Sequence, residues 1–321
     1  MAAKKNETPA PAIQVNKRKK KTVFLQWAPV YLMMLPGLLY LIINNYIPMA
    51  GLVIAFKKVN FTTGIFQSPW VGLSNFEFLF KTDDAFVITR NTLLYNMAFI
   101  IVNLVLGVLI AILISEVRGK KSKTLYQSSV LLPFLMSYVI VSYIVYAFLS
   151  GDTGMMNMSI LPALGMEPIQ WYNTAKYWPF IIIFVQCWKS VGYGVLIYTA
   201  GIAGIDQSLY EAASLDGASK LQQVRHVTLP ALIPSIITLT LLNIGRIFYS
   251  DFSLFYQVPM NSGKIYSTTN TIDTYVYRGL LQLGNVSMAS AAGFYQSCVG
   301  FILVLISNLV VRKVSPDNAL F

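Results

Sequence analysis

The chain has 321 residues, of which 55% are hydrophobic and 12% are charged, and its mean hydropathy is +0.59. Soluble proteins average about 25% charged residues, so this composition excludes an ordinary soluble domain and indicates a polytopic membrane protein. The net charge of +11 does not indicate nucleic-acid binding, because the basic residues gather at the boundaries of apolar segments rather than on one polar face.

Six apolar segments of the chain are long enough to cross a lipid bilayer, which takes about 20 residues of helix. We therefore predict an all-α polytopic membrane protein with six transmembrane helices. Prolines inside the first and third segments are tolerated in a membrane helix where neighbouring groups bond the freed carbonyls. The expected spans run from about Trp27 to Tyr46, Thr92 to Ser115, Ser128 to Leu149, Tyr177 to Gly201, Ala231 to Phe248 and Ser287 to Val311.

The polar segments between the spans set the expected topology. With the amino terminus inside, 15 of the 24 Lys and Arg residues fall on the inner side, among them seven in the tail 1–24 and four in the link 118–123. Basic residues accumulate on the cytoplasmic side, so we expect both termini to be cytoplasmic, with the basic tail beside anionic lipid head groups. The expected outer segments are 48–90, 151–176 and 251–286, the first of which carries Trp70, Phe76, Phe78 and Phe80 at head-group depth.

Groups that could support catalysis or bind a metal are few. Cys187 and Cys298 both lie inside apolar segments, which argues against a disulfide framework or a metal site. The single histidine, His226, has no partners at metal-ligand spacing, and no serine-nucleophile motif occurs. The P-loop pattern of an ATPase is also missing. We therefore expect neither an enzyme nor a metal site in this chain.

The longest polar segment, Leu209 to Pro230, lies between the fourth and fifth spans. Gly217 interrupts it and supplies the left-handed conformation that commonly ends a helix. Pro230 suits the first turn of the helix that follows. We predict a short helical hairpin on the cytoplasmic membrane surface, its two helices opened by the capping boxes Ser208 with Glu211 and Ser219 with Gln222.

The same segment resembles the EAA loop of ABC importer membrane subunits. The resemblance rests on the residues EAA at 211–213, Gly217 and the Leu-Pro pair at 229–230, with Val227 where isoleucine is commoner. It implies the type I ABC importer permease fold, in which this loop is a coupling helix that docks on a separate ATPase. The coupling residues that it implies are Glu211, Ala212, Ala213, Asp216 and Gly217.

Two stretches narrow this resemblance. WVGLSNFEFLF at 70–80 and LYEAASLDGAS at 209–219 look like the maltose-type carbohydrate uptake permeases. They are closer to the branch for complex oligosaccharides such as aldouronates and rhamnogalacturonan fragments, some of them acidic and derived from plant polysaccharides. The implied domains are a basic tail at 1–24, a permease domain at 25–313 with its coupling loop at 203–230, and a cytoplasmic tail at 314–321.

The resemblance also implies the rest of a transporter in a bacterial cell membrane. This chain would be a permease subunit without a cofactor of its own, and ATP and Mg²⁺ would be bound by two separate ATPase subunits. A second, homologous permease would complete the translocation path. An extracellular solute-binding protein would deliver the sugar, and membrane lipids would surround the spans.

Charged side chains inside membrane spans are expensive, so each is a candidate functional residue. Lys189 lies in the fourth span and Arg246 in the fifth, with Asp251 just beyond it. They either form an ion pair between spans that fixes packing or face an acidic substrate, and the sequence leaves both open. The candidate pathway is completed by aromatic residues whose flat faces suit sugar rings, namely Trp188, Tyr193 and Tyr249, with Phe252 and Tyr256 nearby.

Two alternatives stand beside this interpretation. The coupling loop alone also fits an importer of another solute class, such as amino acids, peptides or phosphate, and an uptake screen would separate these. A membrane-embedded enzyme or scaffold protein is the second, and the sequence supplies no catalytic constellation for it.

Gly192 and Gly194 indicate close helix packing rather than a binding loop.

Overall fold

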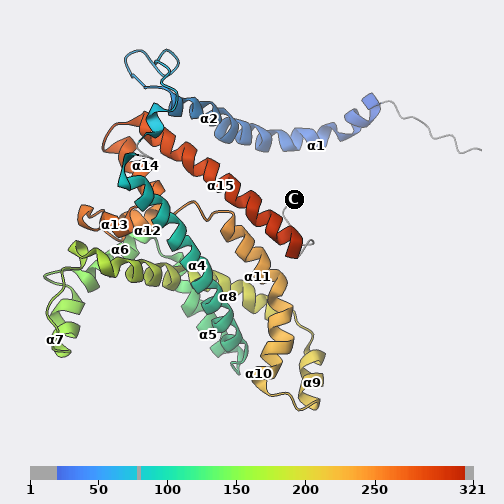
Figure 1. Cartoon of the computed structure of the whole chain (residues 1–321). Helices are drawn as coiled ribbons and strands as arrows, with labels where there is room; N and C mark the ends of the chain where they lie inside the picture. Colours follow the sequence, from blue (N-terminus) through green and yellow to red (C-terminus); the bar gives the residue numbers. More distant parts are fainter. Residues whose placement is uncertain (1–19, 78–80, 315–321) are drawn as a thin grey trace, which may run out of the picture. The chain divides into compact units, whose positions relative to one another are not determined.

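Helices build the structure, a computed structural model that describes residues 20–77 and 81–314 (Figure 1). These residues contain no strand apart from an isolated bridge between Lys57 and Trp70, and the predicted all-α class is confirmed. The chain divides into two units after Val53. The α-helices are α1 Lys20–Leu41, α2 Ile47–Met49, α4 Asp83–Ser115, α5 Lys120–Leu131, α6 Tyr138–Leu149, α7 Leu161–Ala163, α8 Trp178–Ala203, α9 Gln207–Leu215, α10 Lys220–Gln223, α11 Leu229–Ile244, α12 Phe252–Gln257, α13 Tyr266–Thr269, α14 Ile272–Leu281 and α15 Val286–Val314. Shorter 3₁₀ or π turns cover Ile42–Tyr46, Ala50–Phe56, Ser74–Phe76, Leu132–Leu135, Met156–Ile160, Trp171–Asn173, Ala175–Tyr177, Val224–Thr228 and Gly263–Ile265.

The amino-terminal unit is a continuous run of helical turns. Helix α1 passes into a π turn, and an apolar helical segment extends from Trp27 to Phe56, beyond the predicted end at Tyr46. Pro29 and Pro36 lie inside α1 without ending it. The side chains from 27 to 50 are exposed, as suits a helix whose neighbours in a bilayer are lipid chains.

The segment after the first span is only in part the outer loop that we predicted. Its first residues continue the helix to Phe56, and its last residues, from Asp83, belong to α4. Phe76, predicted at head-group depth, is buried within the protein, because its ring packs against Phe56 and edge-on against Phe294 of α15. The other aromatic residues of that prediction are Trp70, which is exposed, and Phe78 and Phe80, which lie outside the described residues.

Among the described residues, five helical segments are long and apolar enough to cross a membrane, or six if one bent pair of helices counts as a span. This agrees with the six spans that the sequence predicts. The five segments are Trp27–Phe56, Asp83–Ser115, Ala175–Ala203, Lys220–Ile244 and Val286–Lys313, and the bent pair is Lys120–Leu135 with Tyr138–Leu149.

The third predicted span, Ser128 to Leu149, is not one straight helix. Helix α5 passes into the 3₁₀ turn Leu132–Leu135, Met136 is extended with φ −77° and ψ 142°, and α6 restarts with its axis turned by 96°. The Ser137 hydroxyl caps α6 by accepting the Ile140 N–H at 3.4 Å. The extended residue followed by a helix cap marks the point at which the span breaks.

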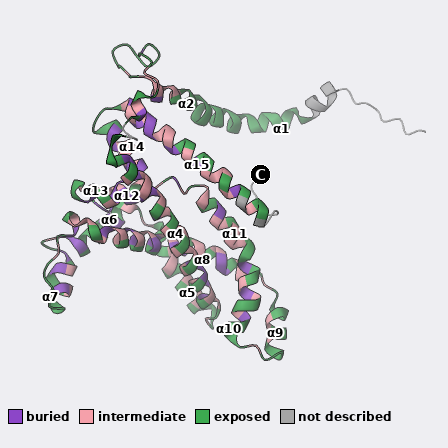
Figure 2. Cartoon of the chain, viewed as in Figure 1, coloured by how far each residue is buried: buried purple, intermediate pink, exposed green. Residues whose placement is uncertain are grey.

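Helix α4 packs along α8 and forms the centre of the second unit. One buried cluster joins Tyr95 of α4 and Trp178 of α8 to Phe255 of α12, and another joins Val108 of α4 to Val195 of α8. Figure 2 shows buried residues along α4, α8 and α15, whereas α1 is exposed from Trp27 onward. In a bilayer, close packing of such side chains holds helices together, because lipid is as apolar as the helix surface.

The predicted outer loop 151–176 is folded around one amide side chain. The Asn157 amide donates to the carbonyls of Gly151 at 2.8 Å and Ile169 at 2.9 Å. Its carbonyl oxygen accepts the Ile169 N–H and the Trp171 indole N–H, each at 3.1 Å. This buried amide makes four hydrogen bonds and so fixes the conformation of the loop.

The predicted outer loop 251–286 is largely helical, since it contains α12, α13 and α14. It is tied to the first turns of α4: the Asn91 amide donates to the Asn270 carbonyl at 2.9 Å, and the Tyr95 hydroxyl donates to the Thr268 carbonyl at 2.7 Å. The polar segment between α8 and α11 contacts the other end of α4, so the two regions lie at opposite ends of this helix.

Candidate functional site

Helix α9 begins the polar segment that the sequence singled out, but with a different cap from the predicted one. Asp206 is the N-cap: its carboxylate accepts the Ser208 N–H at 2.9 Å, and this hydrogen bond holds the pKa of Asp206 below its usual value. Ser208 and Glu211 therefore lie inside α9, and the capping box predicted for them is wrong. Asp and Ser are both good caps, and the earlier of the two takes the role.

The turn between α9 and α10 confirms that Gly217 ends one helix and Ser219 opens the next. Gly217 has a φ of +78°. Its N–H donates to the Ser214 carbonyl at 3.1 Å, and the Ala218 N–H donates to the Ala213 carbonyl at 2.9 Å. This pair of bonds is the usual helix ending built on a left-handed residue. Ser219 then caps α10 in the predicted capping box.

Helix α10 is the start of a long helix rather than the separate short helix that we predicted. It passes through the π turn Val224–Thr228 directly into α11, so one helical segment runs from Lys220 to Ile244. Pro230 lies in the first turn of α11, as expected, but it does not begin a new helix. The second arm of the hairpin is therefore continuous with the fifth span.

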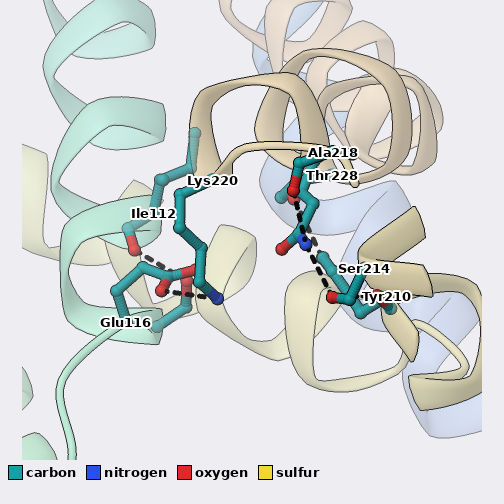
Figure 3. A network of polar contacts seen from close by, with 9 residues as sticks. Ile112, Glu116, Tyr210, Ser214, Ala218, Lys220 and Thr228 are labelled. Atoms are coloured by element: carbon teal, nitrogen blue, oxygen red, sulfur yellow. Dashed lines mark hydrogen bonds and ion pairs between the residues drawn. The ribbon is translucent and has the colours of Figure 1, made fainter. Parts of the chain in front are cut away.

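Hydrogen bonds between side chains hold the two arms of the hairpin together (Figure 3). The Gln223 amide donates to the Ser214 hydroxyl at 2.9 Å and to the Ala218 carbonyl at 3.4 Å. The hydroxyls of Tyr210 and Thr228 lie 2.9 Å apart. Gln223 is buried, so its hydrogen bonds fix α10 against α9.

One ion pair connects the hairpin to helix α4 (Figure 3). The Lys220 ammonium lies 3.2 Å from the carboxylate of Glu116, which follows the last residue of α4. The two side chains are 74% and 47% exposed, so the pair contributes below about 1 kcal/mol. A groove of about 800 Å³ lies beside this contact, and Glu211, Arg118 and Lys123 are among its lining residues.

The hairpin carries exposed apolar side chains. Leu209, Leu215 and Leu221 are 52%, 89% and 77% exposed. Exposed leucines on a polar segment between spans are candidate residues for contact with a partner protein. The predicted coupling residues are placed as follows: Glu211, Ala212, Asp216 and Gly217 are exposed, and Ala213 is half-buried.

A cavity of about 610 Å³ opens between α4, α8 and α11. Its walls combine amide and hydroxyl groups with aromatic rings, which suits a ligand that has both hydroxyls and apolar faces. The amide and hydroxyl side chains are Asn96, Asn103, Gln186, Ser190, Thr240, Asn243 and Ser250, the aromatic ones are Phe99, Phe134, Tyr193, Tyr198 and Tyr249, and the charged ones are Arg246 and Asp251.

Helix α11 unwinds where it reaches this cavity. It ends at Ile244, before the predicted end at Phe248, and the freed backbone is bonded by side chains of other elements. The Asp273 carboxylate accepts the Ser250 N–H at 2.7 Å and its hydroxyl at 2.6 Å, and the Gln296 amide donates to the Phe248 carbonyl at 2.9 Å. Irregular backbone at membrane depth is tolerated only where it is satisfied in this way or lines a polar cavity.

The unwound segment places Arg246 and Asp251 on the cavity wall. Asp251 is engaged as the N-cap of α12, with its carboxylate accepting the Leu254 N–H at 3.3 Å. The Arg246 side chain is exposed, and within the described part of the chain no hydrogen bond or ion pair joins its guanidinium to another residue. Arg246 is therefore free to bind an anionic group in the cavity.

Lys189, the other charged candidate, is buried and does not line the cavity. Its ammonium donates to the Phe134 carbonyl at 3.0 Å and lies 4.7 Å from the centre of the Tyr138 ring. In the described part of the chain neither Lys189 nor Arg246 pairs with Asp251, so the ion pair that the sequence left open does not form.

The cavity brings together four of the six pathway residues that we predicted. The amides on its walls were missed, although an amide inside an apolar span is itself a signal, because such a group needs a partner. The four are Tyr193, Arg246, Tyr249 and Asp251; the two that lie elsewhere are Trp188 and Lys189; and the missed amides are Asn96, Asn103, Gln186 and Asn243.

The fold and the site together define a class: a multi-pass helical membrane protein with a polar cavity among its spans and a helical hairpin joined to one of them. In the described residues no group of three His, Cys, Asp or Glu side chains is placed to hold a metal ion. Residues 103–316 match the family of binding-protein-dependent transport system inner membrane components. The chain belongs to this family, which confirms the resemblance seen in its polar loop.

Relatives span nine-tenths of the chain or more. Protein LplB of Bacillus subtilis (strain 168) is 34% identical over 90% of this chain and 90% of its own. The polygalacturonan/rhamnogalacturonan transport system permease protein YteP of the same organism is 34% identical over 97% of this chain and 98% of its own. A chain of a bacterial ABC transporter involved in the import of the acidic polysaccharide alginate superposes with a TM-score of 0.83 at 30% identity, covering 92% of this chain and 99% of that one.

Proposed function

We propose that this chain is the permease subunit of an ATP-driven ABC importer that moves oligosaccharides, including acidic fragments of plant polysaccharides, into the cytoplasm. The cavity between α4, α8 and α11 carries the proposal, because its amides and hydroxyls can bond sugar hydroxyls and its rings can contact the C–H faces of a sugar. The names of the relatives, which concern polygalacturonan, rhamnogalacturonan and alginate, support the same substrate class.

We further propose that the hairpin of α9 and α10 is the coupling element and lies on the cytoplasmic face, with both chain termini. Its exposed leucines and the continuity of α10 with α11 support this role. Glu211, Ala212, Ala213, Asp216 and Gly217 would then face one of two ATPase subunits, which bind ATP and Mg²⁺. A second homologous permease completes the path, and an extracellular solute-binding protein delivers the sugar.

A pull-down in mild detergent tests the assembly. We expect this chain to co-purify from its native membrane with a P-loop ATPase and a second permease, each identified by mass spectrometry. Glu211→Lys should lose the ATPase but keep the second permease, because it reverses one exposed charge on the hairpin and leaves the spans unchanged. Recovery of neither partner with well-folded protein would contradict the proposal.

Arg246 gives the cavity a preference for acidic sugars. The test compares trigalacturonate with its fully methyl-esterified form, which differs mainly in charge, in proteoliposomes that hold the assembled transporter. Arg246→Gln keeps a hydrogen-bond donor and removes the charge, so we expect the KM for trigalacturonate to rise about tenfold, as for loss of one charge-assisted hydrogen bond. Uptake of the neutral ester should not change.

Lys264→Gln is the matched control for Arg246→Gln, because Lys264 is an exposed basic residue outside the cavity. It removes the same charge from the chain without touching the cavity wall, and it should leave uptake of both sugars at the wild-type level. Equal uptake of trigalacturonate by Arg246→Gln and wild-type transporter would rule out this charge as a determinant of specificity.

A further inference from the structure

At the break in the third span, an aromatic side chain forms part of the cavity wall. Phe134 lies in the 3₁₀ turn before the break, and its ring stacks on that of Tyr193 of α8, with ring centres 5.4 Å apart and planes inclined by 19°. Both rings line the cavity, and the two residues are 40% and 49% exposed. Together they present one aromatic surface to whatever occupies the cavity.

Lys189 lies behind this surface, away from the cavity, and holds it in place. Its buried ammonium donates to the Phe134 carbonyl at 3.0 Å and lies 5.5 Å from the centre of the Phe134 ring and 4.7 Å from that of Tyr138. The last carbonyls of a helical segment form its negative end, so a cation is favourable there. Because Tyr138 lies in α6, beyond the break, Lys189 contacts both sides of the 96° bend.

Polar groups lie next to the aromatic surface. The Tyr138 hydroxyl donates to the Gln186 carbonyl oxygen at 3.3 Å, and the Ser190 hydroxyl donates to the same oxygen. Gln186 and Ser190 both line the cavity together with the two rings. A flat aromatic surface with amide and hydroxyl groups beside it matches a pyranose ring, which has C–H faces and hydroxyls around its edge.

We propose that Phe134 and Tyr193 form a stacking subsite for one sugar ring, and that Lys189 is a positioning residue that fixes the bend and hence this subsite. Lys189 is not a counter-charge for the substrate. The inference rests on the proposed function, because it assigns a part of the same cavity. It gives the two candidate cations different roles: Arg246 binds charge, whereas Lys189 sets the shape of the wall.

The test measures uptake of the same two probes, trigalacturonate and its methyl ester, by the assembled transporter, and it distinguishes the roles of the two cations. Tyr193→Ala and Lys189→Met should each raise KM about tenfold for both probes and change kcat little, since both weaken stacking that does not depend on charge. Lys189→Arg should raise KM less than Lys189→Met does, because a guanidinium can also donate to the Phe134 carbonyl and lie over the Tyr138 ring.

A double-mutant cycle separates positioning from a general structural role. In a Phe134→Ala background, Lys189→Met should raise KM little further, because the group that Lys189 positions is gone. A general structural role would add its full effect in that background and lower the yield of folded transporter for Lys189→Met. Either of those results would overturn the assignment of Lys189 as a positioning residue.

Two other outcomes are also decisive. A KM increase for trigalacturonate alone in Lys189→Met would make Lys189 a counter-charge and contradict the inference. Tyr193→Ala leaves Lys189 and the bend in place, so unchanged uptake of both probes by this variant would remove the stacking subsite even if Lys189→Met misfolds. Wild-type transporter that moves neither probe would instead contradict the proposed substrate class, and this is measured first.

Discussion

Gly192→Ala is expected to reduce the amount of folded protein severely. A Cβ atom at this position would lie 2.3 Å from the Val130 carbonyl oxygen and 2.9 Å from the Leu131 Cα. Both are backbone atoms of α5, so no side-chain rotation can relieve the overlap, and α5 and α8 would have to separate. Inserting an extra methylene group into a well-packed core lowers the free energy of unfolding by about 1–3 kcal/mol. We expect Gly192→Ala to reach or exceed that loss, because the overlap is with backbone atoms.

The control for this prediction lies two residues further along the same helix. A Cβ on Gly194 would meet the Tyr198 ring at 3.7 Å, which is an ordinary van der Waals contact. Gly194→Ala should therefore keep the wild-type yield and melting temperature, measured on detergent-purified protein by size-exclusion chromatography and thermal unfolding. A Gly192→Ala protein with wild-type values in both measurements would mean that α5 and α8 do not cross this closely.

The close crossing at Gly192 also matters for the site. Helix α5 leads into the 3₁₀ turn that carries Phe134, and α8 carries Lys189 and Tyr193. A bulky side chain between the two helices would move the stacked rings apart even in molecules that still fold. The glycine thus connects helix packing to the shape of the cavity.

Features governed by neighbouring residues could be predicted from the sequence. The spans follow from runs of apolar residues, and the helix ending at Gly217 and the cap at Ser219 follow from side chains within a few positions of the backbone groups that they satisfy. The choice of Asp206 over Ser208 as N-cap lay within the same local information, since both residue types are favoured caps. Ser208 alone was predicted as the cap, and the folded helix begins two residues earlier.

Features that depend on distant partners could not be predicted. The break in the third span is held by Lys189, whose hydrogen-bond acceptor lies 55 positions away in the chain. The unwound end of α11 depends on Asp273 and Gln296, which come from α14 and α15. A cation in a span can be recognised as a candidate from the sequence. Whether it faces the cavity or a backbone carbonyl depends on distant residues and therefore on the folded arrangement.

Gly217→Pro is expected to separate ATP hydrolysis from sugar uptake in the assembled importer. Proline fixes φ near −65°, whereas Gly217 has a φ of +78°, and it removes the N–H that donates to the Ser214 carbonyl. The turn between α9 and α10 must therefore open. No heavy atom lies within 4 Å of a Cβ at this position, so the change distorts the turn without disturbing packing of the spans.

We expect uptake by Gly217→Pro to fall at least tenfold with a normal yield of folded protein, and hydrolysis to lose its stimulation by the sugar-loaded binding protein. Gly217→Asn is the control, because asparagine tolerates the left-handed conformation and keeps the N–H, so most uptake should remain. Normal sugar-driven uptake by the proline variant would contradict the coupling role. The prediction follows from the continuity of α10 with α11: if the hairpin drives the fifth span, a hairpin that is badly formed at its tip cannot transmit the movement of an ATPase to the cavity wall.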